Sequence, residues 1–163
     1  MVQIEYLPIV LTGIGIIVSI LYYTSVLRNA SKTRELQIFM AIVNNLNTEE
    51  KRSTYAEVLY EEVKDYDDFW ERLAGKPNPQ NYGKRSSLWW TYNSIGILLK
   101  RGHVSLDVVN ELVGLNVILQ WEKWGDIILE HRTRMNWPNY YTGFEYLAKE
   151  LIKIQEKIPE LRS

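Results

Sequence analysis

The stretch "YLPIVLTGIGIIVSILYYTSVL", residues 6–27, contains no charged side chain, although charged residues stand on both sides of it. A helix rises about 1.5 Å per residue, so a helical segment of this length reaches about 30 Å, the thickness of the hydrocarbon core of a bilayer. Buried helices of soluble proteins seldom run uncharged for so long. The sequence therefore predicts a transmembrane span whose ends are Leu7 and Leu27.

The residues beside this span predict its processing and its orientation. A cleaved signal peptide has a basic start and small residues before the cut, but here Arg28 follows the apolar run directly, so we expect no cleavage. The basic residues Arg28, Lys32 and Arg34 lie after the span, and only Glu5 lies before it. By the positive-inside rule, the N-terminus lies outside and the C-terminal part lies in the cytoplasm.

Beyond the span, apolar residues recur at helical spacing, and no convincing run alternates with a period of two. The pattern predicts an all-α protein in which one N-terminal transmembrane helix continues into a compact bundle of about five to six helices. We expect an anchor over residues 1–28 and a cytoplasmic helical domain over residues 29–163. A Gly- and Pro-rich loop is expected inside that domain, at residues 75–85.

Local signals predict where several helices begin and end. Asn47 with Glu50 resembles a capping box that opens a helix, and the acidic pair at 67–68 is the expected break in that helix. Ser105 suits the N-cap of a short helix that Gly114 would close. These signals give the bundle its expected order of elements.

Composition excludes several classes of function. The chain of 163 residues has a formal net charge of −1, so no global positive field attracts nucleic acid. It has no cysteine, which rules out disulfides, thiolate metal sites and cysteine nucleophiles. Its six Trp and eleven Tyr are more bulky rings than a small helical core readily hides, which favours an aromatic binding surface.

Four stretches carry a family resemblance: "LYYTSVLRNASKTRELQIFM", "WWTYNSIGILLKRGHV", "LQWEKWGDII" and "GFEYLAKE". The chain resembles a family of uncharacterised prokaryotic, largely archaeal, single-span proteins with a helical domain of unknown function. The resemblance extends over nearly the whole chain. It implies the same architecture and a prokaryotic cell membrane as the location, and it brings no activity, cofactor or catalytic residue.

The leading interpretation is a membrane-anchored module that contacts the lipid bilayer and binds a partner protein or a second copy of the chain. Its candidate interaction surface consists of Trp89, Trp90, Trp121, Trp124, Trp137, Tyr140 and Tyr141. Residues 76–102 contain five basic residues and no acidic one. These cations either pair with acidic residues elsewhere or contact anionic lipid headgroups, and they are Lys76, Lys84, Arg85, Lys100 and Arg101.

Two other functions stay open. A small-ligand sensor or an enzyme would use a pocket between helices formed by Glu122, His131, Arg132 and Arg134. No catalytic residue, metal site or cofactor is predicted, because the Glu-x-x-His pairs of di-metal bundles and the glycine motifs of phosphate-binding loops do not occur. RNA binding through residues 130–141 would use arginines beside aromatic rings, and the nearly neutral charge argues against it.

Overall fold

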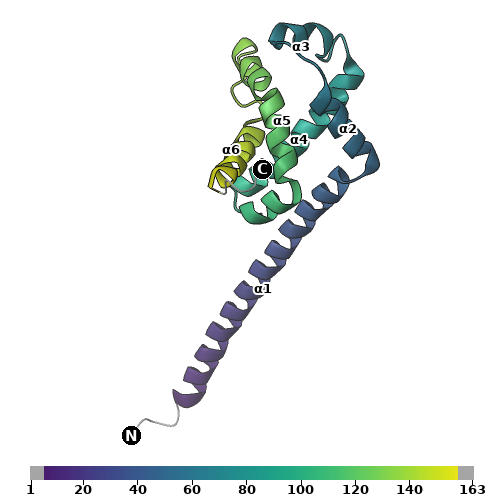
Figure 1. Ribbon diagram of the computed structural model, residues 1–163. Coiled ribbons are helices and arrows are strands. Elements are labelled where there is room, and N and C mark those ends of the chain that lie inside the picture. The colour runs from purple at the N-terminus through teal and green to yellow at the C-terminus, as the bar shows by residue number, and fades with distance from the viewer. Residues whose placement is uncertain (1–5, 158–163) are drawn as a thin grey trace. The chain divides into compact units, whose positions relative to one another are not determined.

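The computed structural model describes residues 6–157, and this range contains six helices and no strand (Figure 1). A long apolar N-terminal helix is followed by a compact helical bundle, which confirms the predicted all-α fold. The helices are α1 (Leu7–Leu46), α2 (Glu49–Tyr60), α3 (Tyr66–Arg72), α4 (Pro79–Lys100), α5 (Leu106–Arg134) and α6 (Thr142–Lys157).

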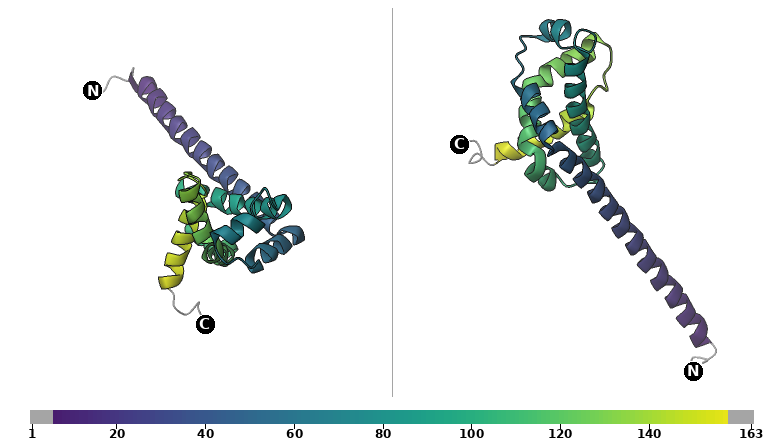
Figure 2. Two further views of the ribbon diagram at one scale, coloured as in Figure 1. Left: turned by 90° about the horizontal axis from the view of Figure 1, so that it is seen from above. Right: turned by 90° about the vertical axis from the view of Figure 1, so that its right-hand side faces the viewer.

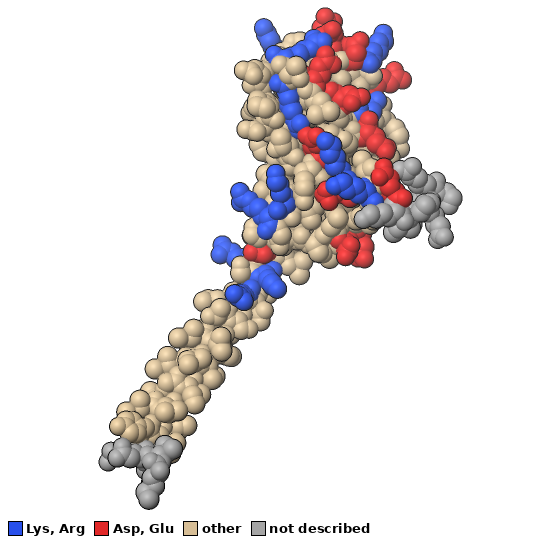
Figure 3. All heavy atoms as spheres, turned by 90° about the vertical axis from the view of Figure 1, so that its left-hand side faces the viewer, with Lys and Arg blue, Asp and Glu red and all other residues tan. Residues whose placement is uncertain are grey.

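Helix α1 runs for 40 residues without a break, as the absence of Gly or Pro after the apolar run predicts. Its first half is uncharged and exposed along its whole length, and Figure 3 shows that blue side chains begin where this half ends. Thr12, Ser19 and Thr24 each donate a hydroxyl hydrogen bond to the carbonyl four residues earlier. Their polar groups are therefore satisfied inside the helix, as a hydrocarbon environment requires. Among the described residues, α1 is the one helix long and apolar enough to cross a membrane.

The chain divides into two compact units, one ending at Ile38 and one beginning at Phe39. The division falls inside α1, so the last turns of this helix belong to the second unit, where Phe39 and Val43 are buried. The predicted end of the anchor at residue 28 follows from the position of the first basic residue after the span, whereas the division at Ile38 follows from packing contacts. The limits of the anchor therefore stay a prediction.

The core of the second unit lies where α4, α5 and α6 meet, and Figures 1 and 2 show α6 beside both of the other helices. Glycines bring two of these helices together. A Cβ atom added at Gly96 of α4 would overlap the backbone of Gly143 in α6. Ile95, Phe144 and Leu147, which are fully buried, fill the space around this crossing. The apolar residues Phe144, Leu147 and Leu151, which recur at helical spacing, thus form the core face of α6.

Helix α6 receives its N-terminal cap from another helix. The Oδ1 atom of Asn93, in α4, accepts hydrogen bonds from the backbone N–H groups of Gly143 at 2.8 Å and Phe144 at 3.3 Å. The first N–H groups of a helix have no partner within that helix and are costly to bury unsatisfied. Asn93 is buried, so the cap belongs to the core of the bundle.

Two predicted boundaries near α2 and α3 are wrong. The N-cap of α2 is Thr48, whose side chain accepts from the Lys51 N–H, and Asn47 is one residue too early. The break lies at residues 61–65, and Asp65 caps α3 by accepting from Asp68. The pair at 67–68 therefore starts a helix, because carboxylates in the first turn interact favourably with the N-terminal end of the helix dipole.

Two predictions based on glycine are also wrong. The loop expected at 75–85 ends earlier, because Asn78 is the N-cap of α4 and Pro79 is its first residue. Gly114 does not close a helix, since α5 continues through it to Arg134. A side chain at Gly114 would meet the Asn110 side chain at 2.6 Å, so this glycine serves packing. Ser105 does cap α5, as expected.

Candidate functional site

The most distinctive surface feature is a set of rings gathered around His131, which we call the aromatic band. It consists of Tyr66 and Trp70 of α3, His131 of α5, and Trp137 and Tyr140 of the α5–α6 connection. The His131 ring centroid lies 5.9 Å from that of Trp70 and 4.6 Å from that of Tyr140. Trp137 extends the band at 5.1 Å from Tyr140. Rings at these separations attract one another and form one contiguous surface.

The ends of the band are exposed, and its centre is packed. Trp70 is 45% exposed and Trp137 is 53% exposed, whereas Tyr66 is buried and His131 and Tyr140 are half-buried. Trp90 of α4, 56% exposed, joins the same network through Tyr141, whose ring lies 5.5 Å from it. Three large apolar side chains are therefore offered to solvent around a rigid base.

The connection between α5 and α6 is rigid for identifiable reasons. The Trp137 N–H donates to the Arg132 carbonyl, and Asn136 has a φ of 50°. The Nε atom of Arg132 donates to the Tyr140 carbonyl at 2.7 Å, and its guanidinium pairs with Glu145 of α6. The segment "NWPNYY" is thus a structured turn in which Trp137 remains largely exposed.

Within the described residues, one hydrogen bond joins two side chains of the aromatic band. The Nδ1 atom of His131 lies 2.9 Å from the Tyr66 hydroxyl oxygen. Burial lowers the pKa of His131, which favours the neutral imidazole, and burial raises the pKa of Tyr66. Burial also raises the pKa of Tyr140 to about 12. These neutral side chains therefore act as a packed support for the exposed rings. No carboxylate or serine is hydrogen-bonded to His131 in the described part of the chain, so the contact does not resemble a catalytic pair.

The structure does not gather the residues of the predicted pocket into one cavity-facing cluster. Glu122 is exposed and shares no hydrogen bond or ion pair with His131 within residues 6–157. Arg132 pairs with Glu145, and Arg134 pairs with Asp67 and Glu130. RNA binding would need these arginines for phosphates, and here carboxylates neutralise them. No group of three or more His, Asp or Glu residues in the described part is placed to hold a metal ion.

The residues of the predicted interaction surface differ in how much of each side chain is exposed. Trp89, Trp124 and Tyr141 are core residues, so they are not surface anchors, and the prediction is wrong for them. The indole N–H of Trp124 donates to the Val58 carbonyl at 3.0 Å, which places this ring in the interior. Trp121 is half-buried and packs on Phe144. Trp90, Trp137 and Tyr140 keep accessible surface.

Sequence reasoning did not single out Trp70 as a surface residue. It placed the break at 67–68, whereas the break lies at 61–65 and Trp70 belongs to α3. Trp70 stacks at 6.1 Å on Tyr66, four residues earlier, and leaves its other side open. An open groove of about 470 Å³ adjoins it and is lined by Trp70, Glu71, Ala74, Gly75, Lys76 and Pro77.

The five cations for which the sequence leaves ion pairing or lipid contact open differ in their surroundings. Arg85 is buried, its guanidinium donates to the Leu73 carbonyl and Asn81, and so it cannot reach a lipid headgroup. The lipid-contact alternative is therefore wrong for Arg85, whereas the pairing alternative agrees with its ion pair to Glu61. Desolvation of this cation is tolerated because hydrogen bonds and aromatic faces surround it. Lys84 pairs with Glu57 on the surface. Lys76, Lys100 and Arg101 are exposed.

Comparison with known sequences places this fold in a family. A family model described as "Domain of unknown function (DUF4760)" matches residues 9–151, which include most of α1 and nearly all of the bundle. No curated protein and no solved structure matches the chain. The match agrees with the resemblance to an uncharacterised family, while the archaeal and single-span features stay predictions. The chain belongs to the DUF4760 family of domains of unknown function.

Proposed function

We propose that this protein is a membrane-anchored interaction module. The uncharged half of α1 crosses a prokaryotic cell membrane once, and the helical domain lies on the cytoplasmic side. The aromatic band binds a protein partner, either another protein or a second copy of the chain. The observation that carries the proposal is the exposure of Trp70 and Trp137 on either side of the packed rings of His131 and Tyr140.

Exposed tryptophan rings are unfavourable in water and favourable in a protein interface. A large apolar ring left in water loses the free energy that burial would give, and burial against a partner recovers it. Tryptophan is among the residues that most often dominate binding energy, particularly where surrounding contacts exclude water. The rigid base under Trp137 reduces the entropy that binding must remove. The groove beside Trp70 offers further apolar area at the same edge.

The anchor and its orientation are supported by charge. Arg28, Lys32 and Arg34 follow the uncharged segment, and basic residues near a span are retained on the cytoplasmic side. Hydroxyls within the segment bond to their own helix, so the exposed surface of this half of α1 is apolar. Protease added to intact cells should leave the helical domain undigested, whereas digestion before lysis would contradict the orientation.

Affinity purification from solubilised membranes tests the interaction. The double variant Trp70→Ala with Trp137→Ala should retain roughly tenfold less partner, or still less, than the natural chain. Tyr60→Ala is the matched control, because Tyr60 is 79% exposed, makes no ring contact in the described residues and lies outside the aromatic band. Membrane association should be equal in all three chains, since none of these residues lies in the span.

Two differently tagged copies expressed together separate the possible partners. Co-purification of one tag with the other identifies a second copy as the partner, and its loss in the double variant supports the aromatic band as the interface. If the double variant and the Tyr60 control retain equal amounts of every bound protein, the band is not the interface and the proposal is refuted.

A further inference from the structure

A small cavity in the second compact unit lies apart from the aromatic band. It lies between the end of α1, the α1–α2 turn, α2, α4 and α5, opens to solvent beside the exposed residues Asn47, Arg52 and Asn116, and its volume is about 70 Å³. A single water needs roughly 10–15 Å³ of such space, so this cavity has room for an ion of several heavy atoms. Its lining is half polar, and the residues that matter for the inference are Asn47, Arg52, Tyr55, Tyr92 and Asn116.

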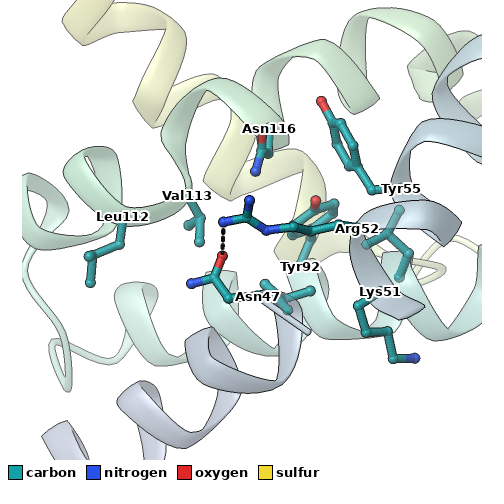
Figure 4. Close-up of a pocket in the computed structure, with 10 residues that line it drawn as sticks. Asn47, Lys51, Arg52, Tyr55, Tyr92, Leu112, Val113 and Asn116 are labelled. Atoms are coloured by element: carbon teal, nitrogen blue, oxygen red, sulfur yellow. Dashed lines mark hydrogen bonds between the residues drawn. The ribbon is translucent and has the colours of Figure 1, made fainter. Parts of the chain in front are cut away.

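Arg52 supplies the charge of this cavity. Figure 4 shows its guanidinium group reaching across the cavity between Asn47 and Asn116. It donates one long hydrogen bond, 3.4 Å, to the Oδ1 atom of Asn47, which leaves most of its N–H donors available. Lys51 contributes only its stem, because its ammonium group donates to the Ser87 hydroxyl at 2.8 Å.

Tyr92 supplies a hydroxyl that is free to bond a ligand in the cavity. Its side chain is 1% exposed and lines the same cavity as Arg52, as Figure 4 shows. Within residues 6–157 this hydroxyl makes no hydrogen bond to another protein group. The hydroxyl of Tyr55, on the same lining, is also buried without a partner. Burial raises the pKa of both tyrosines, so both hydroxyls stay protonated and able to donate.

These groups select the chemical class of the ligand. The guanidinium, the tyrosine hydroxyls and the side-chain amides all donate hydrogen bonds, and no carboxylate is among the described residues that line the cavity. A metal cation would meet a positive charge there and find few anionic ligands. A phosphate group offers several acceptor oxygens and negative charge in a compact volume, and its geometry suits a guanidinium.

We propose that this cavity binds a phosphate group, either free phosphate or the phosphate of a small ester, through the Arg52 guanidinium and the Tyr92 hydroxyl. A bound phosphate accepts a hydrogen bond from the Tyr92 hydroxyl, which makes none to the described residues, and pairs with the free donors of Arg52. The site is independent of the aromatic band, so failure of the proposed interaction surface leaves this inference standing.

The test measures binding of inorganic phosphate to the full chain in detergent micelles. Titration calorimetry at constant ionic strength, with chloride replaced by phosphate, should show saturable binding at one site. Arg52→Gln should weaken the affinity roughly tenfold or more, because it removes a charged donor. The control Arg101→Gln removes the same charge from an exposed residue outside the cavity and should leave the affinity unchanged.

A second variant guards against a change in folding. Tyr92→Phe retains the buried ring and removes only the hydroxyl, so it should reduce phosphate affinity severalfold while the helical circular dichroism stays the same. Titrations with glycerol phosphate and with phosphatidic acid vesicles identify free phosphate, a soluble ester or a lipid headgroup as the preferred source.

Absence of saturable phosphate binding overturns the proposal. Equal weakening by Arg52→Gln and Arg101→Gln also overturns it, because the attraction would then be a general effect of charge. Tighter binding of acetate than of phosphate would refute the assignment of the ligand class.

Discussion

The Nδ1 atom of His131 lies 2.9 Å from the hydroxyl oxygen of Tyr66, and this contact joins α5 to the first residue of α3. The two residues are 65 positions apart in the chain. Their rings form the packed centre of the aromatic band, from which Trp70 and Trp137 project. The geometry of the proposed binding surface therefore depends on a neutral, well-packed His131.

The first prediction concerns acid sensitivity. Burial lowers the folded-state pKa of His131, so the unfolded chain binds this proton more readily than the folded chain. The contribution of His131 to the free energy of unfolding is therefore present above its unfolded-state pKa of about 6.5 and decreases as pH falls through that value. Urea unfolding in micelles should show the natural chain losing its advantage over His131→Asn between about pH 7.5 and about pH 5. An advantage independent of pH would contradict this role.

The second prediction concerns the crossing of α4 and α6. Gly96→Ala places a Cβ atom against the backbone of Gly143, which cannot move away without separating the two helices. We expect the free energy of unfolding to fall by roughly 2 kcal/mol or more. Gly83→Ala is a control in the same helix, since no atom lies within 4 Å of its added Cβ. That variant should be neutral or stabilised by about 0.5–1 kcal/mol, because alanine favours helix over glycine.

The third prediction concerns the shared cap of α6. Asn93→Ala leaves the N–H groups of Gly143 and Phe144 buried without their acceptor. We expect a loss of about 1–2 kcal/mol in the free energy of unfolding. Hydrogen exchange should accelerate mainly in the first turn of α6. Ser94→Ala removes a side-chain bond within its own helix, to Trp90, and should change stability by less than about 0.5 kcal/mol.

The fourth prediction concerns the buried Arg85. Its guanidinium donates to the Leu73 carbonyl, lies 3.4 Å from Glu61, and faces the ring of Phe69 at 4.8 Å. Arg85→Ala should cost about 3 kcal/mol or more, because it leaves these acceptors unpaired in the interior. Arg85→Lys should not restore stability, since one ammonium group cannot reproduce the planar set of donors.

Lys84→Gln is the control for Arg85, because it breaks the neighbouring ion pair with Glu57, in which both side chains are about half exposed. Surface pairs of this type contribute about 0–1 kcal/mol, so thermal unfolding should shift little. Equal shifts for the two substitutions would mean that the burial of Arg85 adds nothing to stability.

Several features of the bundle were predictable because their causes are local. Ser105 caps α5 through the N–H of Val108, three residues later. The same local logic failed by one residue at the start of α2, where Asn47 and Thr48 are both good caps and only one has the required backbone conformation. It failed at Gly114 because a glycine that allows close packing and a glycine that ends a helix are identical in sequence.

The candidate surface was only partly predictable. Trp89 and Trp90 are adjacent, yet the first is 2% exposed and the second is 56% exposed. Successive residues of a helix point about 100° apart, so one can face the core while its neighbour faces solvent. Aromatic residues occur on more than one face of α4, and composition cannot say which face the other helices cover. Trp70 was missed because the break before α3 lies at residues 61–65 and not at the acidic pair 67–68.

The sequence by itself determined the long uncharged helix and the all-α class, because hydropathy and helical periodicity act within a few turns of chain. The tertiary structure alone decided which tryptophans are buried, that Arg85 lies in the core, and that Asn93 caps a helix fifty residues away. Each of these depends on one helix meeting another. The free energy of such a contact belongs to a pair of distant segments, and neither segment encodes it separately.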